Sequence, residues 1–244
     1  MLLVPTNIIL FPNSCYIQTK TFYDIPSMRA PHFISRRTLL THLKELFEHS
    51  TPTTSPSVVV LIGMGGAGKT QLALEYCRDL KDLKTHRAIF WLDASSHNAL
   101  YAAIERIAKQ LWPERELKDS DAALTLVKDT LSNWSDAWLM VFDNLDRPSD
   151  LKGILNFFPD STRRSILITS RYTGSEVLGQ AIKLNEMEMK EGLQLLLPSG
   201  RVDSEQHMAA EEIVRRLGYL PLAIDQARAY IRRRKLQLGD FMAE

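Results

Sequence analysis

One segment of the chain combines residue types and spacing that suit phosphate chemistry. Residues 63–70 match the pattern G-x-x-x-x-G-K-S/T. Glycines let a phosphate approach the backbone, whose N–H groups then point inward at the start of a helix. Lys69 would bridge the β- and γ-phosphates, and the Thr70 hydroxyl would bind Mg²⁺. The sequence therefore predicts a phosphate site here, and the alternative is a glycine-rich turn that binds nothing. The expected contacts are Gly63, Gly65, Gly66, Ala67, Gly68, Lys69, Thr70 and Gln71.

Two further candidate side chains follow buried strands. Asp143 ends the apolar run 138–142, and ligands of parallel sheets bind at the carboxyl ends of strands. We expect this acid to hold the metal beside Thr70, although an Asp after a strand is often a turn residue. Arg171 follows the run 165–169 and could sense a γ-phosphate, the alternative being a solvated arginine at a strand end.

The residue after Asp143 bears on hydrolysis. Many P-loop ATPases carry a second acid at this position to polarise the attacking water, whereas Asn144 cannot act as a general base. Asp146 could substitute for the missing acid. We expect the protein to be at most a slow ATPase.

Strands and helices alternate around these residues. The expected strands are 58–62, 88–92, 138–142, 165–169 and 181–184, and the helices between them are 69–83, 98–111, 120–131 and 151–157. This alternation predicts an α/β fold, a P-loop NTPase parallel sheet flanked by helices. Three helical patterns, 187–196, 204–217 and 222–235, then predict a small all-helical subdomain.

The chain divides into three expected parts. Residues 1–31 form an irregular N-terminal segment, because four prolines oppose regular structure. Residues 32–185 form the nucleotide-binding α/β domain, and residues 186–244 form the helical subdomain. Ser35 is expected to cap the first helix, whose apolar residues recur at helical spacing.

The motifs together resemble the NB-ARC branch of the STAND nucleotide-binding switches, found in NOD-like and plant resistance receptors. Residues 33–37 look like the family's hydrophobic-hydrophobic-Gly-Arg-Glu segment, and residues 90–96 resemble the strand after its P-loop helix. Residues 169–171 match its T-T/S-R sensor segment, and residues 218–223 resemble its G-L-P-L-A motif. The resemblance covers nearly the whole chain and is greatest to receptors of filamentous fungi.

The resemblance implies further site residues. Ile34 and Arg36 would contact the adenine, while Pro221 and Leu222 would close over the base from the helical subdomain. Ser35 and Arg37 replace the family's glycine and acid in the adenine segment. The resemblance also implies that the helical subdomain is incomplete here and that the family's winged-helix domain is absent from this chain.

The composition excludes other classes of protein. The chain has 244 residues, 45% hydrophobic and 24% charged, which is ordinary for a globular protein. Thirty Lys and Arg against 29 Asp and Glu argue against a polycationic nucleic-acid arm. The longest apolar run, 137–142, is too short to span a membrane, and two cysteines make no disulfide framework. We expect a cytoplasmic protein with neither membrane nor nucleic acid as its partner.

These observations favour an ADP/ATP-binding switch module of a NOD-like receptor that uses Mg²⁺ and acts in innate immune signalling. Lys69, Asp143 and Arg171 would act on the phosphates, and nucleotide exchange would control conformation. The resemblance implies that this change drives self-association in the full receptor. One alternative is an ATPase whose turnover drives work. Another is a regulator that also binds nucleic acid, through the basic cluster 232–235.

Overall fold

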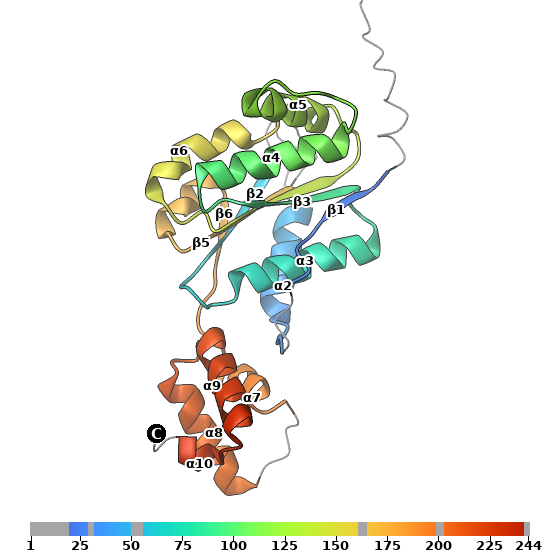
Figure 1. Cartoon of the computed structure of the whole chain (residues 1–244). Helices are drawn as coiled ribbons and strands as arrows, with labels where there is room; N and C mark the ends of the chain where they lie inside the picture. Colours follow the sequence, from blue (N-terminus) through green and yellow to red (C-terminus); the bar gives the residue numbers. More distant parts are fainter. Residues whose placement is uncertain (1–19, 29–31, 50–55, 161–164, 199–202, 242–244) are drawn as a thin grey trace, which may run out of the picture.

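A six-stranded parallel sheet forms the centre of the α/β part of the molecule (Figure 1). The computed structural model describes residues 20–28, 32–49, 56–160, 165–198 and 203–241. The strand order is β1-β3-β4-β5-β2-β6, and each neighbouring pair runs parallel. The strands are β1 (Phe22–Asp24), β2 (Ser57–Ile62), β3 (Ala88–Asp93), β4 (Trp138–Asp143), β5 (Ser165–Ser170) and β6 (Gln180–Lys183). The expected α/β fold class is confirmed.

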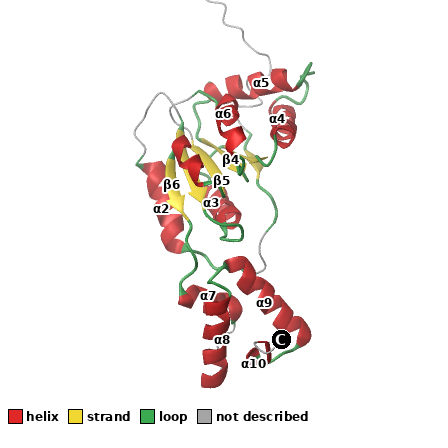
Figure 2. Cartoon of the chain, turned by 90° about the vertical axis from the view of Figure 1, so that its left-hand side faces the viewer, coloured by secondary structure: helices red, strands yellow, loops and turns green. Residues whose placement is uncertain are grey.

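Helices cover both faces of this sheet (Figures 1 and 2). Helices α2 (Arg37–Glu48) and α3 (Lys69–Leu83) lie on one face. The other face carries α4 (His97–Leu111), α5 (Ser120–Ser132) and α6 (Leu151–Ile154). Short 3-10 turns complete this part, namely η1 (Pro148–Asp150), η2 (Leu155–Phe157) and η3 (Thr173–Leu178).

The two-residue period of the strands divides the core in two. In β2, Val60 and Ile62 face the core under α4 and α5, whereas Val59 and Leu61 face the core under α2 and α3. Every residue of β4 is buried. Strands that are buried on both faces need continuous apolar runs, and this is why the central strands could be recognised in the sequence.

The last four helices form a separate unit with its own core (Figures 1 and 2). They are α7 (Met189–Leu196), α8 (Ser204–Arg216), α9 (Pro221–Arg234) and α10 (Leu238–Phe241). Glu188 and Glu191 form a capping box at the start of α7, and the Asp203 side chain caps α8. Pro221 occupies the first turn of α9, where its missing N–H costs no helical hydrogen bond.

Two local expectations were wrong. Residues 1–31 were expected to be irregular, yet β1 lies within them and pairs with β3 at the sheet edge. Three residues are too few to show a two-residue period, so the strand is stabilised by its tertiary contacts. Ser35 does not cap the first helix, because α2 begins at Arg37 after an Arg36 whose side chain makes no capping bond.

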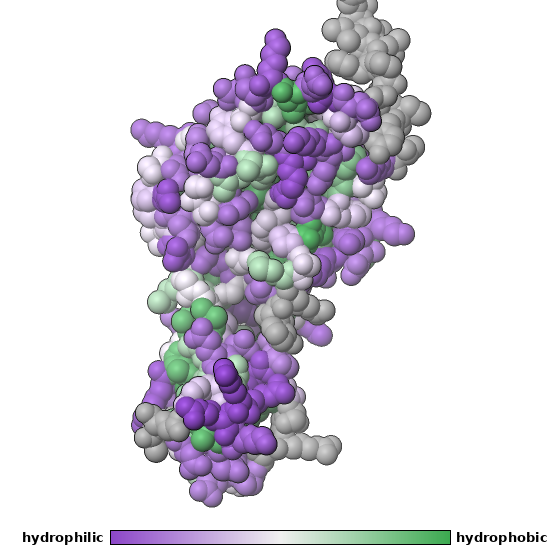
Figure 3. Space-filling model, viewed as in Figure 1, coloured by the Kyte–Doolittle hydropathy of each residue, from purple (hydrophilic) through white to green (hydrophobic). Residues whose placement is uncertain are grey.

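The surface is mostly hydrophilic in the view of Figure 3, with some apolar side chains near the junction of the two units. Met64 and Leu222 are more than half exposed. Within the described part of the chain, every helix is too short or too polar to cross a lipid bilayer.

The edge strand β1 is expected to contribute to stability through Phe22. This side chain is only 4% exposed, and its ring packs against Phe90 and Trp134 at centroid distances of 6.4 and 5.9 Å. Phe22→Ala should lower the free energy of unfolding by about 3 kcal/mol, because it removes a buried aromatic ring. Urea unfolding followed by circular dichroism measures this difference. Met28→Ala, at a 63% exposed position, is the control. Equal stability of the two variants would contradict a packed edge strand.

Candidate functional site

The loop after β2 is shaped by glycines at two close approaches. A Cβ on Gly63 would lie 2.8 Å from the carbonyl oxygen of Leu184, the residue after β6. Gly66 has a φ of +81°, and a Cβ there would lie 2.9 Å from Leu222 Cβ in α9. A side chain at either position would push a neighbouring element away. The loop then enters α3 directly, so its N–H groups lie at a helix N-terminus, where anions bind favourably.

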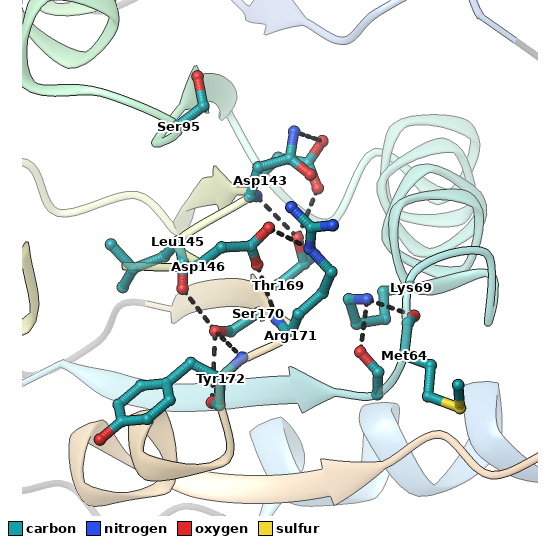
Figure 4. Close-up of polar contacts among 12 residues, drawn as sticks. Met64, Lys69, Ser95, Asp143, Leu145, Asp146, Thr169, Ser170, Arg171 and Tyr172 are labelled. Atoms are coloured by element: carbon teal, nitrogen blue, oxygen red, sulfur yellow. Dashed lines mark hydrogen bonds and ion pairs between the residues drawn. The ribbon is translucent and has the colours of Figure 1, made fainter. Parts of the chain in front are cut away.

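Lys69 begins α3 and folds back over this loop. Its Nζ donates hydrogen bonds to the carbonyl oxygens of Gly63 and Met64, at 2.8 and 2.9 Å (Figure 4). The side chain is buried, and burial lowers the pKa of its ammonium, whereas the carboxylates of Asp146 and Asp143 raise it. The two bonds use two of the three ammonium protons, so a concentrated positive charge lies at the loop.

Asp143 ends β4 and is 5% exposed. Its Oδ1 accepts hydrogen bonds from the hydroxyls of Thr70 and Thr169, at 2.9 and 2.5 Å. Burial raises the pKa of this carboxyl, and the two hydroxyl bonds act in the opposite direction. The hydroxyl of Thr70 and the carboxylate of Asp143 are therefore adjacent oxygen donors.

This pair fits Mg²⁺ better than a metal that needs a dense ligand cage. Mg²⁺ prefers oxygen ligands, keeps several waters and is held by one or two carboxylates together with phosphates. Among the described residues there is no group of three or more His, Cys, Asp or Glu side chains that could hold a metal.

The loop after β4 is joined by hydrogen bonds to the last two residues of β5. Asn144 N–H donates to Thr169 Oγ1 at 3.0 Å, and Leu145 N–H donates to the Thr169 carbonyl at 2.9 Å. The Ser170 hydroxyl returns a bond to the Leu145 carbonyl. Asn144 has a φ of +67°, a left-handed conformation that asparagine adopts more readily than most residues. The Asn144 amide therefore occupies the position at which many P-loop ATPases carry a second acid.

Arg171 follows β5 and is held by Asp146. The Arg171 backbone N–H and Nε donate to the two carboxylate oxygens of Asp146, at 2.7 and 2.6 Å (Figure 4). The Arg171 side chain is 63% exposed, whereas that of Asp146 is 19% exposed. Arg171 thus presents a cation to the surface of the loop region while Asp146 lies behind it.

Lys69, Asn144 and Arg171 border a cavity of about 480 Å³ between the α/β part and the helical unit. A cavity of this size can take a small organic ligand. The helical unit also bonds directly to residues 63–70, the P-loop, since Leu222 N–H donates to the Gly66 carbonyl at 3.3 Å. The cavity is lined by His32, Phe33, Ile34, Arg36, Gly65, Gly66, Ala67, Gly68, Lys69, Thr70, Gln71, Leu72, Asn144, Arg171, Met187, Leu195, Pro221, Leu222 and Asp225.

Most residues expected from the sequence line this cavity, but Gly63 and Asp143 are not on its wall. Gly63 acts through the carbonyl that holds Lys69, and Asp143 lies next to Thr70. Sequence reasoning missed His32, Leu72, Met187, Leu195 and Asp225 as lining residues. The last four lie in segments whose spacing indicated only packed helices, and no motif marks any of the five.

Arg36 contacts the connection between the two units. Its terminal nitrogens donate to the carbonyl oxygens of Asn185 and Glu186, at 2.9 and 3.1 Å. Its Nε lies 3.7 Å from the carboxylate of Glu191 in α7. Ile34 packs against the core of the helical unit. The segment before α2 therefore contacts the cavity, the connection and the helical unit together.

Comparison with known families agrees with this geometry. The model of the NB-ARC domain matches residues 39–200, more than half of the chain. The chain belongs to the NB-ARC family. A nucleotide-binding leucine-rich repeat (NLR)-like protein of Hyaloscypha variabilis is 28% identical to it over 250 residues. That alignment covers 90% of this chain but 24% of the relative, so the chain spans about a quarter of the relative's length.

Solved structures share the fold of this NB-ARC domain. Cdc6p from Pyrobaculum aerophilum superposes with a TM-score of 0.61 at 16% identity, covering 87% of this chain and 66% of that one. A STAND protein with a tetratricopeptide repeat sensor from Pyrococcus horikoshii gives a TM-score of 0.50 at 15% identity, covering 81% and 30%. The sheet is thus of the P-loop NTPase type.

The hydroxyl of Thr169 is expected to be important for the stability of this site. It donates to the Asp143 carboxylate and accepts from Asn144 N–H. Thr169→Val has the same shape but leaves both partners without this bond, so unfolding should be easier by about 1–3 kcal/mol. Thermal or urea unfolding measures the loss. Thr125→Val, at an exposed position of α5, is the matched control. A Thr169→Val variant as stable as this control would be inconsistent with the bonding described.

Proposed function

We propose that this NB-ARC domain is the ADP/ATP-binding switch module of a cytoplasmic NOD-like receptor. The observation that carries the proposal is the shared cavity: the P-loop forms one side and the start of α9 forms another. A nucleotide in this cavity contacts both units, so a change of nucleotide can change their arrangement.

Lys69 and the N–H groups of the P-loop bind the phosphates. The lysine is already held at the loop by two carbonyl oxygens, and its burial strengthens its attraction to an anion. The start of α3 adds the positive end of the helix dipole. Gln71 and Thr70, in the first turn of α3, border the same space.

Thr70 and Asp143 hold Mg²⁺, the threonine as a direct oxygen ligand and the carboxylate beside it. The 2.9 Å hydrogen bond between them supports this assignment, because it keeps both oxygens at one point of the site. The ion neutralises phosphate charge when it is bound.

The adenine lies between apolar side chains from both units. Ile34 comes from the segment before α2, and Pro221 and Leu222 come from α9. The Leu222 N–H bond to the Gly66 carbonyl supports closure of the helical unit over the nucleotide. Arg36 joins this segment to the connection that leads into α7.

Arg171 distinguishes ATP from ADP by binding the γ-phosphate. It is a cation on the cavity wall, and its terminal nitrogens are not used in its two bonds to Asp146. Asn144 lines the cavity where a catalytic acid would be needed, so hydrolysis is slow at most. In the full receptor, exchange of ADP for ATP drives self-association.

Denaturing the purified protein should release an adenine nucleotide, with ADP as the main species. The buried Lys69, the pair of metal-binding oxygens and the position of the cavity between two units favour slow dissociation of the nucleotide. Chromatography of the released material identifies the nucleotide.

Lys69→Ala should abolish the retained nucleotide and any thermal stabilisation by added ADP and Mg²⁺. Lys109→Ala removes the same charge from an exposed position of α4 and should leave both unchanged. If no adenine nucleotide is retained and Lys69→Ala binds ADP as the wild type does, the proposed function is wrong.

A further inference from the structure

Asp146 is a charged group to which the resemblance assigns no role. It lies three residues after Asp143, in the loop that follows β4. The possibility that it replaces the missing catalytic acid was left open in the sequence. Its two oxygens are both used by Arg171, at 2.7 Å from the backbone N–H and 2.6 Å from Nε.

The position of Asp146 does not suit a general base. Arg171 and Asn144 line the cavity, whereas Asp146 does not. A base must come within hydrogen-bond reach of the attacking water, directly or through one other water. Asp146 instead contacts Arg171 from outside the cavity wall, and Figure 4 shows its carboxylate directed at the arginine.

The two bonds hold Arg171 at its backbone and at Nε. The bond to the backbone N–H fixes where the side chain starts, and the bond to Nε fixes the inner edge of the guanidinium. Four of the five guanidinium N–H groups lie on the terminal nitrogens and take no part in these two bonds. The Arg171 side chain lies against the P-loop, since its Cδ and Nη1 lie 3.7 and 3.8 Å from the position that a Cβ on Gly65 would occupy.

The loop that carries Asp146 is itself fixed to β5. Asn144 and Leu145 bond to Thr169, and Ser170 bonds back to Leu145. The carboxylate is therefore anchored on the strand pair that also carries the metal-site acid. It is also near Lys69, whose pKa it raises against the lowering effect of burial.

We propose that Asp146 is a positioning residue that aims Arg171 at the γ-phosphate. The proposal rests on the proposed role of Arg171 in sensing that group. A free arginine side chain on an exposed surface samples many rotamers, and holding one of them in advance removes this ordering cost from ATP binding. Asp146 thereby makes the site more selective for ATP over ADP without touching either nucleotide.

Asp146→Asn tests this directly. The amide keeps the size of the side chain but loses the charge that binds Nε. Affinities for ADP and for a non-hydrolysable ATP analogue with an imido bridge are measured by calorimetry with Mg²⁺ on nucleotide-free protein. The analogue should bind about tenfold more weakly, equivalent to about 1.4 kcal/mol, while ADP should change by about twofold or less. Asp160→Asn, an exposed acid that precedes β5, should change neither affinity.

A double-variant comparison separates positioning from an independent role. Arg171→Ala should also weaken the analogue relative to ADP, and Asp146→Asn should add nothing to it, because the group that it positions is gone. Additive losses, tighter analogue binding by Asp146→Asn, or an unchanged analogue-to-ADP ratio in that variant would each overturn the proposal.

The same data distinguish this failure from failure of the proposed function. If Arg171→Ala changes the ratio of analogue affinity to ADP affinity and Asp146→Asn does not, the positioning role of Asp146 is wrong, while the sensing role of Arg171 is supported. If Arg171→Ala leaves this ratio unchanged, the sensing role of Arg171 and the positioning role of Asp146 are both wrong. If Asp146→Asn does not fold, Asp146→Glu retains the charge but moves it outward by one methylene. A normal ratio in that variant would contradict a requirement for this exact geometry.

Discussion

A carboxylate at the end of a fully buried strand needs hydrogen-bond donors, and much of this site is arranged around that requirement. Asp143 cannot be solvated freely, so the hydroxyls of Thr70 and Thr169 bond to it. These two donors come from α3, which packs on one face of the sheet, and from β5, the neighbour of β4. The start of α3 and the end of β5 are consequently held at fixed positions relative to one acid. The order of the sheet, with β4 and β2 on the two sides of β5, makes this possible.

The sequence predicted the α/β architecture because the central strands are buried on both faces. Such strands read as unbroken apolar runs, and five of the predicted helices agree closely with α3, α4, α5, α8 and α9. The edge strand β1 was missed because three residues contain no period, and its stability comes from Phe22 packing against distant rings. The start of α2 was missed because Ser35 has the residue type of a cap without making the bond.

The candidate site was predictable where a backbone conformation requires a residue type. Gly63 and Gly66 are glycines because side chains there would meet Leu184 and Leu222, and such requirements appear as motifs. No sequence motif predicts the hydrogen bonds between Asp146 and Arg171. The two residues lie 25 positions apart and meet through the pairing of β4 and β5. Met187, Leu195 and Asp225 were missed because the cavity exists only once the helical unit packs against the P-loop.

The contacts of Arg36 affect which substitutions can accumulate in this protein during evolution. Its acceptors are main-chain carbonyls of Asn185 and Glu186, which every amino acid supplies. Mutation of those two side chains leaves the acceptors in place, whereas mutation of Arg36 removes the donor. These two bonds are therefore one-sided, and correlated substitutions of Arg36 with Asn185 or Glu186 in related sequences would fail to reveal them.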